Sequence, residues 1–231
     1  DDERFFPYAP DGAGDPEAYL GDRRRRARRA LSLLHWDAWA SGAPATFEQL
    51  FRGMNPRKLQ AACVPLGTTD LPALVIVEAP MGEGKTEAAF YLADAWNTAG
   101  WRGAYVAMPT QATSNQLYGR YEAFLGRRYG GQVVNLQLLH GHASLEAGLR
   151  VLERGEEAPI PVSVDEGGDP TATVGAAEWF THRKRGLLAP FGVGTIDQAL
   201  MAVLQVRHGF VRLYGLAGKV VVIDEVHAYD T

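Results

Sequence analysis

Short apolar runs rich in β-branched residues recur along the chain, and segments of helical character separate most of them. The runs are predicted as strands, at 73–79, 103–109, 133–139, 187–193 and 219–224. The helical segments extend roughly over 85–98, 111–128, 145–154 and 196–206. This alternation predicts an α/β fold, in which a parallel sheet carries helices on both faces and a ligand site lies beyond the carboxyl ends of the strands.

The amino-terminal part of the chain departs from this pattern. Breaker residues crowd the first 20 positions, and a helix with six arginines and two aspartates is predicted from Asp22 to about residue 40. Its basic face is either solvated, with Leu and Trp packing on the domain, or a patch for nucleic acid or a protein partner. Residues 1–46 are therefore interpreted as a linker and a basic helix, and residues 47–231 as the α/β domain. Asn55 and Pro56 predict the start of a short helix that follows.

Composition restricts the class of protein. The 231 residues include 23 Lys and Arg against 27 Asp and Glu, a net charge of -4, which argues against coating nucleic acid through overall positive charge. The only cysteine, Cys63, cannot form an internal disulfide, and no apolar run approaches the ~18 residues of a membrane span. We expect a soluble, cytoplasmic protein that does not contact a membrane.

A glycine-rich segment, APMGEGKT at 79–86, follows the first predicted strand and opens a predicted helix. It matches the phosphate-loop pattern G-x-x-x-x-G-K-[ST], except that Ala79 replaces the first glycine. The glycines let main-chain N–H groups surround phosphate oxygens, and the helix N-terminus adds its dipole. We expect Lys85 to reach the β- and γ-phosphates of ATP and the Thr86 hydroxyl to ligate Mg²⁺. The whole group predicted to bind ATP here comprises Pro80, Met81, Gly82, Glu83, Gly84, Lys85 and Thr86.

A second acidic motif ends the last apolar run. Four apolar residues lead to Asp224 and Glu225 at the tip of a predicted strand, as in a Walker B motif. Asp224 is expected to hold Mg²⁺, and Glu225 to orient and deprotonate the attacking water. A second carboxylate beside the metal ligand favours hydrolysis over phosphoryl transfer to another substrate. Taken alone, the run is also compatible with a buried strand whose acids cap its solvent end.

Together these motifs resemble the first RecA-like lobe of a superfamily 2 helicase, which carries A-x-x-G-x-G-K-T and then a DExH box. The run DEVHAYD, preceded by RGLLAPFGVGTIDQAL and GLAGKVVVI, is more specifically similar to the CRISPR-associated helicase-nuclease of type I systems. The resemblance covers about residues 47–231. The opening DDERFFPY looks like the tail of that family's HD nuclease domain, but the sequence contains no adjacent His-Asp pair, so the nuclease site is absent from this chain.

The resemblance implies further site residues. Gln60 is similar to the glutamine of the Q motif, which contacts adenine, and Arg57 assists it; a helix-surface position is the alternative for Gln60. His227, in the DExH box, couples nucleotide state to the neighbouring lobe. A last group resembles the motifs that grip a single-stranded DNA backbone, although helix capping accounts for some of its members equally well: Thr110, Gln111, Ser114, Gly194 and Thr195.

The resemblance also implies that the lobe is incomplete at its carboxyl end. In that fold a further strand inserts between those at 73–79 and 219–224, so we expect these two to lie roughly 10 Å apart without direct pairing. A second RecA-like lobe and the HD nuclease domain are expected outside this chain, which alone should be nearly inactive.

The function favoured is therefore an ATP- and Mg²⁺-dependent translocase on single-stranded DNA. It would unwind CRISPR-targeted DNA for a separate HD nuclease domain, with the surveillance complex (Cascade) as partner. Two alternatives stay open: another superfamily 2 motor, such as an RNA helicase or a restriction-type translocase, or a lobe that only binds nucleotide or docks on the surveillance complex.

Overall fold

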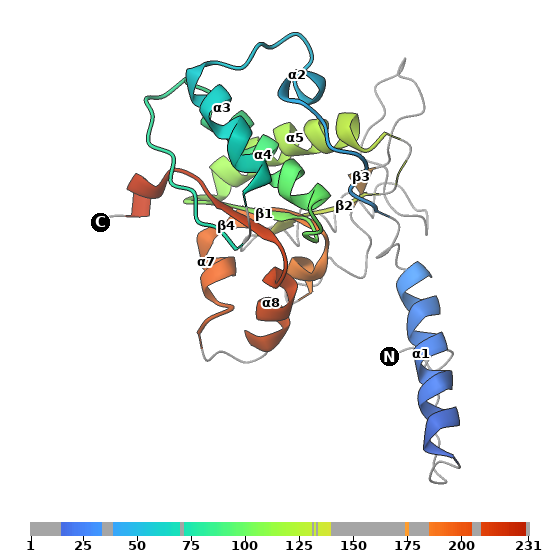
Figure 1. Ribbon diagram of the computed structural model, residues 1–231. Helices are drawn as coiled ribbons and strands as arrows, with labels where there is room; N and C mark the ends of the chain where they lie inside the picture. The colour runs from blue at the N-terminus through green and yellow to red at the C-terminus, as the bar shows by residue number, and fades with distance from the viewer. Residues whose placement is uncertain are drawn as a thin grey trace, which may run out of the picture.

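A five-stranded sheet forms the centre of the chain (Figure 1). The computed structural model describes residues 15–33, 39–69, 72–130, 132, 134–139, 174–175, 185–204 and 209–229. The strands are β1 (Ala104–Met108), β2 (Val134–Leu139), β3 (Val174–Gly175), β4 (Phe191–Thr195) and β5 (Val220–Ile223). Their order is β3-β2-β4-β1-β5, and every pairing is parallel. The predicted α/β class is confirmed.

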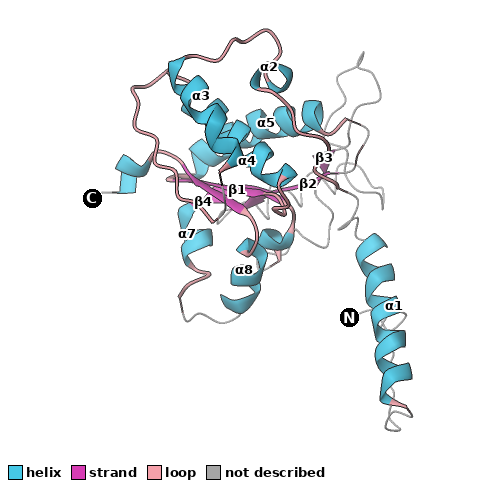
Figure 2. Cartoon of the chain, in the orientation of Figure 1, coloured by secondary structure: helices cyan, strands magenta, loops and turns pink. Residues whose placement is uncertain are grey.

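Helices cover both faces of this sheet, as predicted (Figures 1 and 2). One layer holds α2 (Phe47–Leu50), α3 (Lys58–Cys63), α4 (Lys85–Thr98) and α5 (Gln111–Arg128), and the other holds α7 (Ile196–Leu200) and α8 (Gly209–Leu216). The bounds of α4 and α5 are those predicted. Short 3-10 turns complete the described elements: η1 (Val64–Thr68), η3 (Gly186–Leu188) and η4 (Val226–Tyr229).

The core lies between the sheet and the α4–α5 layer. β1 and β4 are buried along their whole lengths, which accounts for their continuous apolar character. The rings of Phe90 on α4 and Tyr121 on α5 lie 4.6 Å apart, and Phe90 is also 5.3 Å from Phe124. Tyr121 in turn meets Phe191 of β4 edge-on at 6.0 Å. Aromatic packing therefore holds α4 and α5 together on the sheet.

The run at 73–79 is not a strand, which corrects the prediction made for it. Its side chains alternate as in a strand: Leu74 and Ile76 are 86% and 76% exposed, whereas Val75 and Val77 pack against the core. A strand also needs a neighbouring backbone to pair with, and within the described residues β5 pairs only with β1. The expected absence of ladder bonds between 73–79 and β5 therefore holds, although the run itself is merely extended.

The fourth strand begins later than predicted, at Phe191 instead of residue 187. The residues before it form η3, and the Lys219 ammonium at the start of β5 donates hydrogen bonds to the carbonyls of Leu187, at 2.6 Å, and Ala189. Because these two carbonyls bind the buried Lys219 side chain, they are not available for hydrogen bonds to a neighbouring strand. Leu187 and Leu188 therefore belong to a turn that precedes the strand, and Leu187 is buried in it.

Other predicted bounds also shift. The basic helix α1 (Pro16–Leu33) starts before Asp22, and its Leu20 and Leu31 are 51% and 38% exposed. Trp39, from the end of the predicted basic stretch, packs against the core, with its ring 4.9 Å from that of Phe191. α3 is capped by Arg57, two residues after the expected Asn55. α7 ends at Leu200, although a helix to residue 206 was expected. The helix expected at 145–154 lies outside the described residues.

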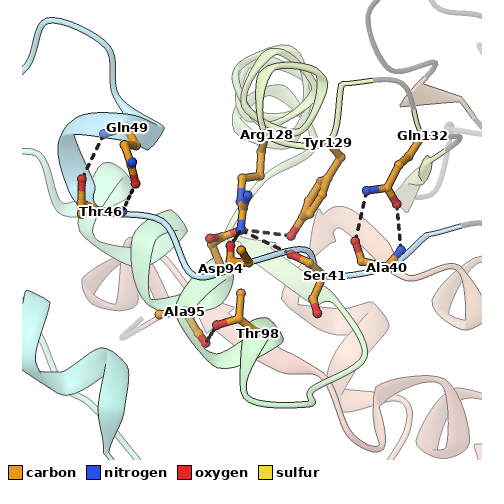
Figure 3. Close-up of polar contacts among 11 residues, drawn as sticks. Ala40, Ser41, Thr46, Gln49, Asp94, Ala95, Thr98, Arg128, Tyr129 and Gln132 are labelled. Carbon is orange, nitrogen blue, oxygen red and sulfur yellow. Dashed lines mark hydrogen bonds and ion pairs between the residues drawn. The ribbon is translucent and has the colours of Figure 1, made fainter.

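A polar network fastens residues 39–46 to the lobe (Figure 3). Gln132 exchanges two hydrogen bonds with the backbone of Ala40, and Arg128 donates to the carbonyls of Ser41 and Ala43. Arg128 also pairs with Asp94 of α4, at 2.7 Å between Nε and Oδ1. Burial raises the pKa of the Asp94 carboxyl, and the hydrogen bond and charge of Arg128 oppose that rise.

Candidate nucleotide-binding site

The predicted site residues gather at the carboxyl edge of the sheet. Met108 of β1 lies beside Thr195 of β4, and Ala107 lies beside Ile223 of β5. The Asp224 N–H then donates to the Ala107 carbonyl at 3.0 Å, so the first acid directly continues the ladder. As the parallel topology predicted, the carboxyl ends of β4, β1 and β5 meet at one edge of the sheet, and the two acids that follow β5 lie there.

The phosphate loop turns into α4 through two glycines with left-handed backbone. Gly82 and Gly84 both have φ of 80°, and Gly84 caps the helix. A φ of 80° is strained for any other residue, and a Cβ built on Gly84 would also lie 2.0 Å from Gln60 Nε2, so glycine is favoured there. Lys85 Nζ donates to the carbonyls of Ala79, at 2.8 Å, and Pro80, at 3.0 Å. Lys85 thus bridges the two ends of the loop, and it lines the cavity in which we expect the phosphates.

Two residues of the predicted adenine motif brace this loop. Arg57 Nη1 donates to the Gly82 carbonyl, and Gln60 Nε2 donates to the Gly84 carbonyl at 3.3 Å. Gln60 Oε1 also accepts from the Arg57 N–H at 2.9 Å, and the glutamine is 5% exposed. The alternative of a solvent-facing Gln60 is therefore wrong. In this conformation both faces of its amide are bound within the protein.

Asp224 and Glu225 follow β5 in an uncommon backbone geometry. Glu225 has φ of 54°, the only positive φ among described residues other than glycine. Its N–H donates to its neighbour's carboxylate, Asp224 Oδ1, at 2.8 Å. A non-glycine residue in this region costs about 1 kcal/mol or more, and such strain concentrates at functional sites. His227 belongs to η4, but its side chain lies outside the described residues.

One cavity of about 610 Å³ unites these groups. Its walls come from α3, the phosphate loop, α4, α5 and the end of β5. They comprise Met54, Asn55, Arg57, Gln60, Met81, Gly82, Gly84, Lys85, Thr86, Glu87, Arg120, Asp224 and Glu225. Most of the predicted ATP-binding residues and both predicted acids thus line the same space, whereas Pro80 and Glu83 do not line it.

The donors for a metal ion are also brought together. Thr86 and Asp224, the two predicted Mg²⁺ ligands, line this one cavity. Within the described ranges no cluster of three or more His, Cys, Asp or Glu side chains could hold a metal. Mg²⁺ usually takes one or two protein oxygens and completes its shell with substrate phosphates and water, so this sparse donor set fits it.

The predicted DNA-contacting residues lie at the same sheet edge but have structural roles there. The Thr110 hydroxyl caps α5 by accepting from the Thr113 N–H at 3.2 Å, and Ser114 Oγ is buried and donates to the Thr110 carbonyl at 2.8 Å. Thr195 is 7% exposed, and a Cβ on Gly194 would lie 2.1 Å from the Leu139 carbonyl oxygen. Gln111 is exposed. Their contact with DNA stays a prediction.

Two charged residues at the cavity were not predicted. Glu87 follows Thr86 in the first turn of α4, and Arg120 reaches it from the middle of α5, at 2.7 Å between Nη2 and Oε1. Glu87 was findable, because it directly follows the phosphate-loop motif. Arg120 was not, since 33 residues separate the partners and no local pattern connects them.

Comparisons with known proteins agree with this geometry. No protein-family model matches the chain. The CRISPR-associated endonuclease/helicase Cas3 of Thermus thermophilus is 46% identical over 99% of this chain, and the CRISPR-associated nuclease/helicase Cas3 of Streptococcus thermophilus is 38% identical over 99%. The chain spans about a quarter of the length of these curated relatives, 24% in each case.

Solved structures give the same result. The crystal structure of T. fusca Cas3-AMPPNP is 39% identical, with a TM-score of 0.72, over 98% of this chain and 24% of that one. T. fusca Cas3 has also been solved with ADP and with ATP. In the part of this chain that the structure describes, no helix is long and apolar enough to cross a membrane. From end to end, the chain corresponds to a segment of the CRISPR-associated Cas3 helicase-nucleases and contains part of a RecA-like lobe.

Proposed function

We propose that this chain is the ATP-hydrolysing first lobe of a motor that translocates on single-stranded DNA during CRISPR interference. One observation carries the proposal: Lys85 and Thr86, from the start of α4, share a cavity with Asp224 and Glu225, from the end of β5. A cation, a hydroxyl and two adjacent carboxylates at one point are what Mg²⁺-dependent hydrolysis of a nucleoside triphosphate requires.

The division of labour follows from the chemistry of the side chains. Lys85 leaves the carbonyls of Ala79 and Pro80 to meet the β- and γ-phosphates, and main-chain N–H groups of the loop bind their oxygens. Thr86 and Asp224 would hold Mg²⁺, which would neutralise charge that develops on the phosphates. Glu225 orients the attacking water and accepts its proton. Gln60 and Arg57 fix the loop, and the Gln60 amide contacts adenine by exchanging its bonds to Arg57 and Gly84 for bonds to the base.

The wider role rests on the relatives. Their names join a nuclease to a helicase, which supports a division in which the motor unwinds DNA and a separate HD nuclease domain cuts it. We further propose that a second RecA-like lobe completes the ATP site, that the CRISPR surveillance complex (Cascade) recruits the protein, and that it works in the cytoplasm.

Nucleic-acid-dependent ATP hydrolysis by the full-length protein tests this function against its rivals. The rate is measured with single-stranded DNA, with RNA of the same sequence and without nucleic acid. Stimulation by DNA well above that by RNA is expected. Equal or greater stimulation by RNA would favour an RNA helicase. Tight nucleotide binding without hydrolysis under any condition would instead favour a docking lobe.

A further inference from the structure

The ion pair between Glu87 and Arg120 joins the nucleotide cavity to a helix that the mechanism leaves without a role. Both residues line the cavity, beside Lys85 and Thr86. Glu87 Oε1 accepts from Arg120 Nη2 at 2.7 Å, with the two side chains 24% and 50% exposed. A Cβ built on Gly84 would lie 3.4 Å from Glu87 Oε2, so the second carboxylate oxygen sits close to the phosphate loop. The carboxylate of Glu87 therefore lies between that loop and α5.

The surrounding packing makes this contact more than a surface pair. Phe90 follows Glu87 by three residues on the same face of α4, and its ring lies 4.6 Å from that of Tyr121, the neighbour of Arg120. Tyr121 is 1% exposed. The ion pair is thus the solvent-side end of a contact between α4 and α5 whose inner part is aromatic. Because cores are densely packed, displacement of one helix moves the other.

Helix α5 reaches from this pair to the carboxyl edge of the sheet. It spans 18 residues, starts beside Thr110 and carries Arg120 about 15 Å further along its axis. Its first turn is tightly capped, by the Thr110 and Thr113 hydroxyls and by Ser114 Oγ. DNA bound at that turn would displace α5 as a rigid helix. The ion pair with Glu87 connects the middle of α5 to the first turn of α4, so that turn would move with it.

We infer that Arg120 is a positioning residue for ATP hydrolysis: through Glu87 it fixes the first turn of α4, and it links the predicted DNA-binding end of α5 to the phosphate loop. Arg120 also neutralises Glu87, a carboxylate that would otherwise repel the phosphates beside it. This inference rests on the proposed function, because it explains how bound DNA accelerates hydrolysis.

Steady-state kinetics of the full-length protein, with and without single-stranded DNA, test the inference. Arg120→Gln is expected to lower the ratio of DNA-stimulated to basal kcat by about tenfold, the size of a typical coupling between sites, while the KM for ATP changes little. Arg120→Lys, which keeps the charge, should retain most of the stimulation. Arg127→Gln is the matched control, since Arg127 is exposed on the same helix and has no ion pair among described residues.

A double-mutant cycle adds a second readout. If Arg120 acts through Glu87, then Glu87→Gln and the double variant should lose the same stimulation as Arg120→Gln, without further loss. If the double variant shows the product of the two single losses of stimulation, the inference is overturned. A stimulation ratio that Arg120→Gln leaves unchanged, or that Arg127→Gln lowers equally, would also overturn it. A rise in KM without a change in the ratio would instead make Arg120 a direct nucleotide contact. A wild-type protein that binds ATP but never hydrolyses it would remove the proposed function as well.

Discussion

Glu225 and Asp224 are adjacent but occupy different backbone conformations. Asp224 continues the ladder of β5, whereas Glu225 turns away from it with φ of 54°. The main chain therefore leaves the direction of β5 directly after Asp224. Backbone strain of this kind concentrates at functional sites, and it fits the proposal that Asp224 is the metal ligand and Glu225 the water activator.

Replacing each acid should reveal this separation. Glu225→Gln keeps the shape and the metal ligand, so we predict that ATP binding is retained while hydrolysis falls by roughly 100-fold or more. Asp224→Ala should weaken binding of ATP with Mg²⁺ itself. Nucleotide affinity, measured with a fluorescent ATP analogue, and single-turnover hydrolysis distinguish the two. An equal loss of affinity in both variants would mean that the roles have been assigned the wrong way round.

Lys85 offers a second test on a single residue. Its ammonium donates to two loop carbonyls, so Lys85→Ala removes the charge that we propose meets the γ-phosphate, together with one partly buried and one exposed hydrogen bond. We predict that ATP hydrolysis by the full-length protein is abolished, with little change in melting temperature. Turnover at the wild-type rate would exclude the loop as the phosphate site.

At the scale of elements, the starts of α5 and α7 are the predicted DNA contacts. The Thr110 side chain also caps α5, whereas that of Thr195 makes no capping hydrogen bond to α7. Thr110→Ala together with Thr195→Ala is expected to weaken single-stranded DNA binding by about the same factor for every sequence, because phosphate contacts position a strand without reading bases. Titrations with several sequences and salt concentrations measure this.

Thr110→Asp is the matched control for capping. Aspartate is a good N-cap, so α5 should stay as stable as before, yet its charge would repel a phosphate. The Thr110→Asp variant should therefore bind DNA more weakly than wild type. Unchanged affinity and salt dependence in this variant and in the double alanine variant would leave Thr110 and Thr195 with structural roles alone.

Lys219 makes the start of β5 sensitive to pH. Burial lowers the pKa of its ammonium from 10.5 to about 7. Between about pH 7 and 10.5 the unfolded chain therefore binds more protons than the folded one, and the free energy of unfolding rises with pH across that window, by up to about 1.4 kcal/mol per pH unit. Thermal melts at pH 7, 8 and 9 should show this rise in wild type and a much flatter profile in Lys219→Met. Identical pH profiles would exclude Lys219 as the cause.

The same lysine shows where prediction from the sequence stopped. The bounds of α4 and α5 were predictable because Gly84 and Thr110 end the preceding segments with strong local signals. The start of β4 was not, because the carbonyls of Leu187 and Ala189 bind a cation that lies 30 or more residues away. Likewise 73–79 has the residues of a strand, and only the sheet order shows that no described strand pairs with it.

Motifs with local spacing located the phosphate loop and both acids, whereas the contacts that brace them, such as Arg120 with Glu87, depend on the tertiary fold.

At the scale of the whole molecule, the nucleotide cavity opens onto an apolar surface. Met54, Met81 and Val226 are 57%, 86% and 64% exposed, and the two methionines line the cavity itself. β5, the strand next to β1 at the end of the described sheet, has two further exposed apolar side chains. Val221 is 43% exposed and Ile223 is 47% exposed. Apolar side chains gathered beside a charged site suit a surface that another protein segment covers, and the curated relatives are about four times as long as this chain.

We therefore predict that residues 1–231 alone bind nucleotide weakly and hydrolyse it at least about 100-fold more slowly than the full-length protein, because the cations that oppose Glu225 in a two-lobe motor come from the second lobe. Comparing ATPase rates of the two proteins at equal concentration, with and without single-stranded DNA, measures the difference.

Met81→Asp in the full-length protein should lower hydrolysis for the same reason, by opposing closure over the cavity, while Met201→Asp, on the opposite helical layer, serves as its control. Two results together would show that the described cavity is complete without a second lobe. These are full ATPase activity of the 231-residue chain, and hydrolysis by the full-length protein that Met81→Asp leaves unchanged.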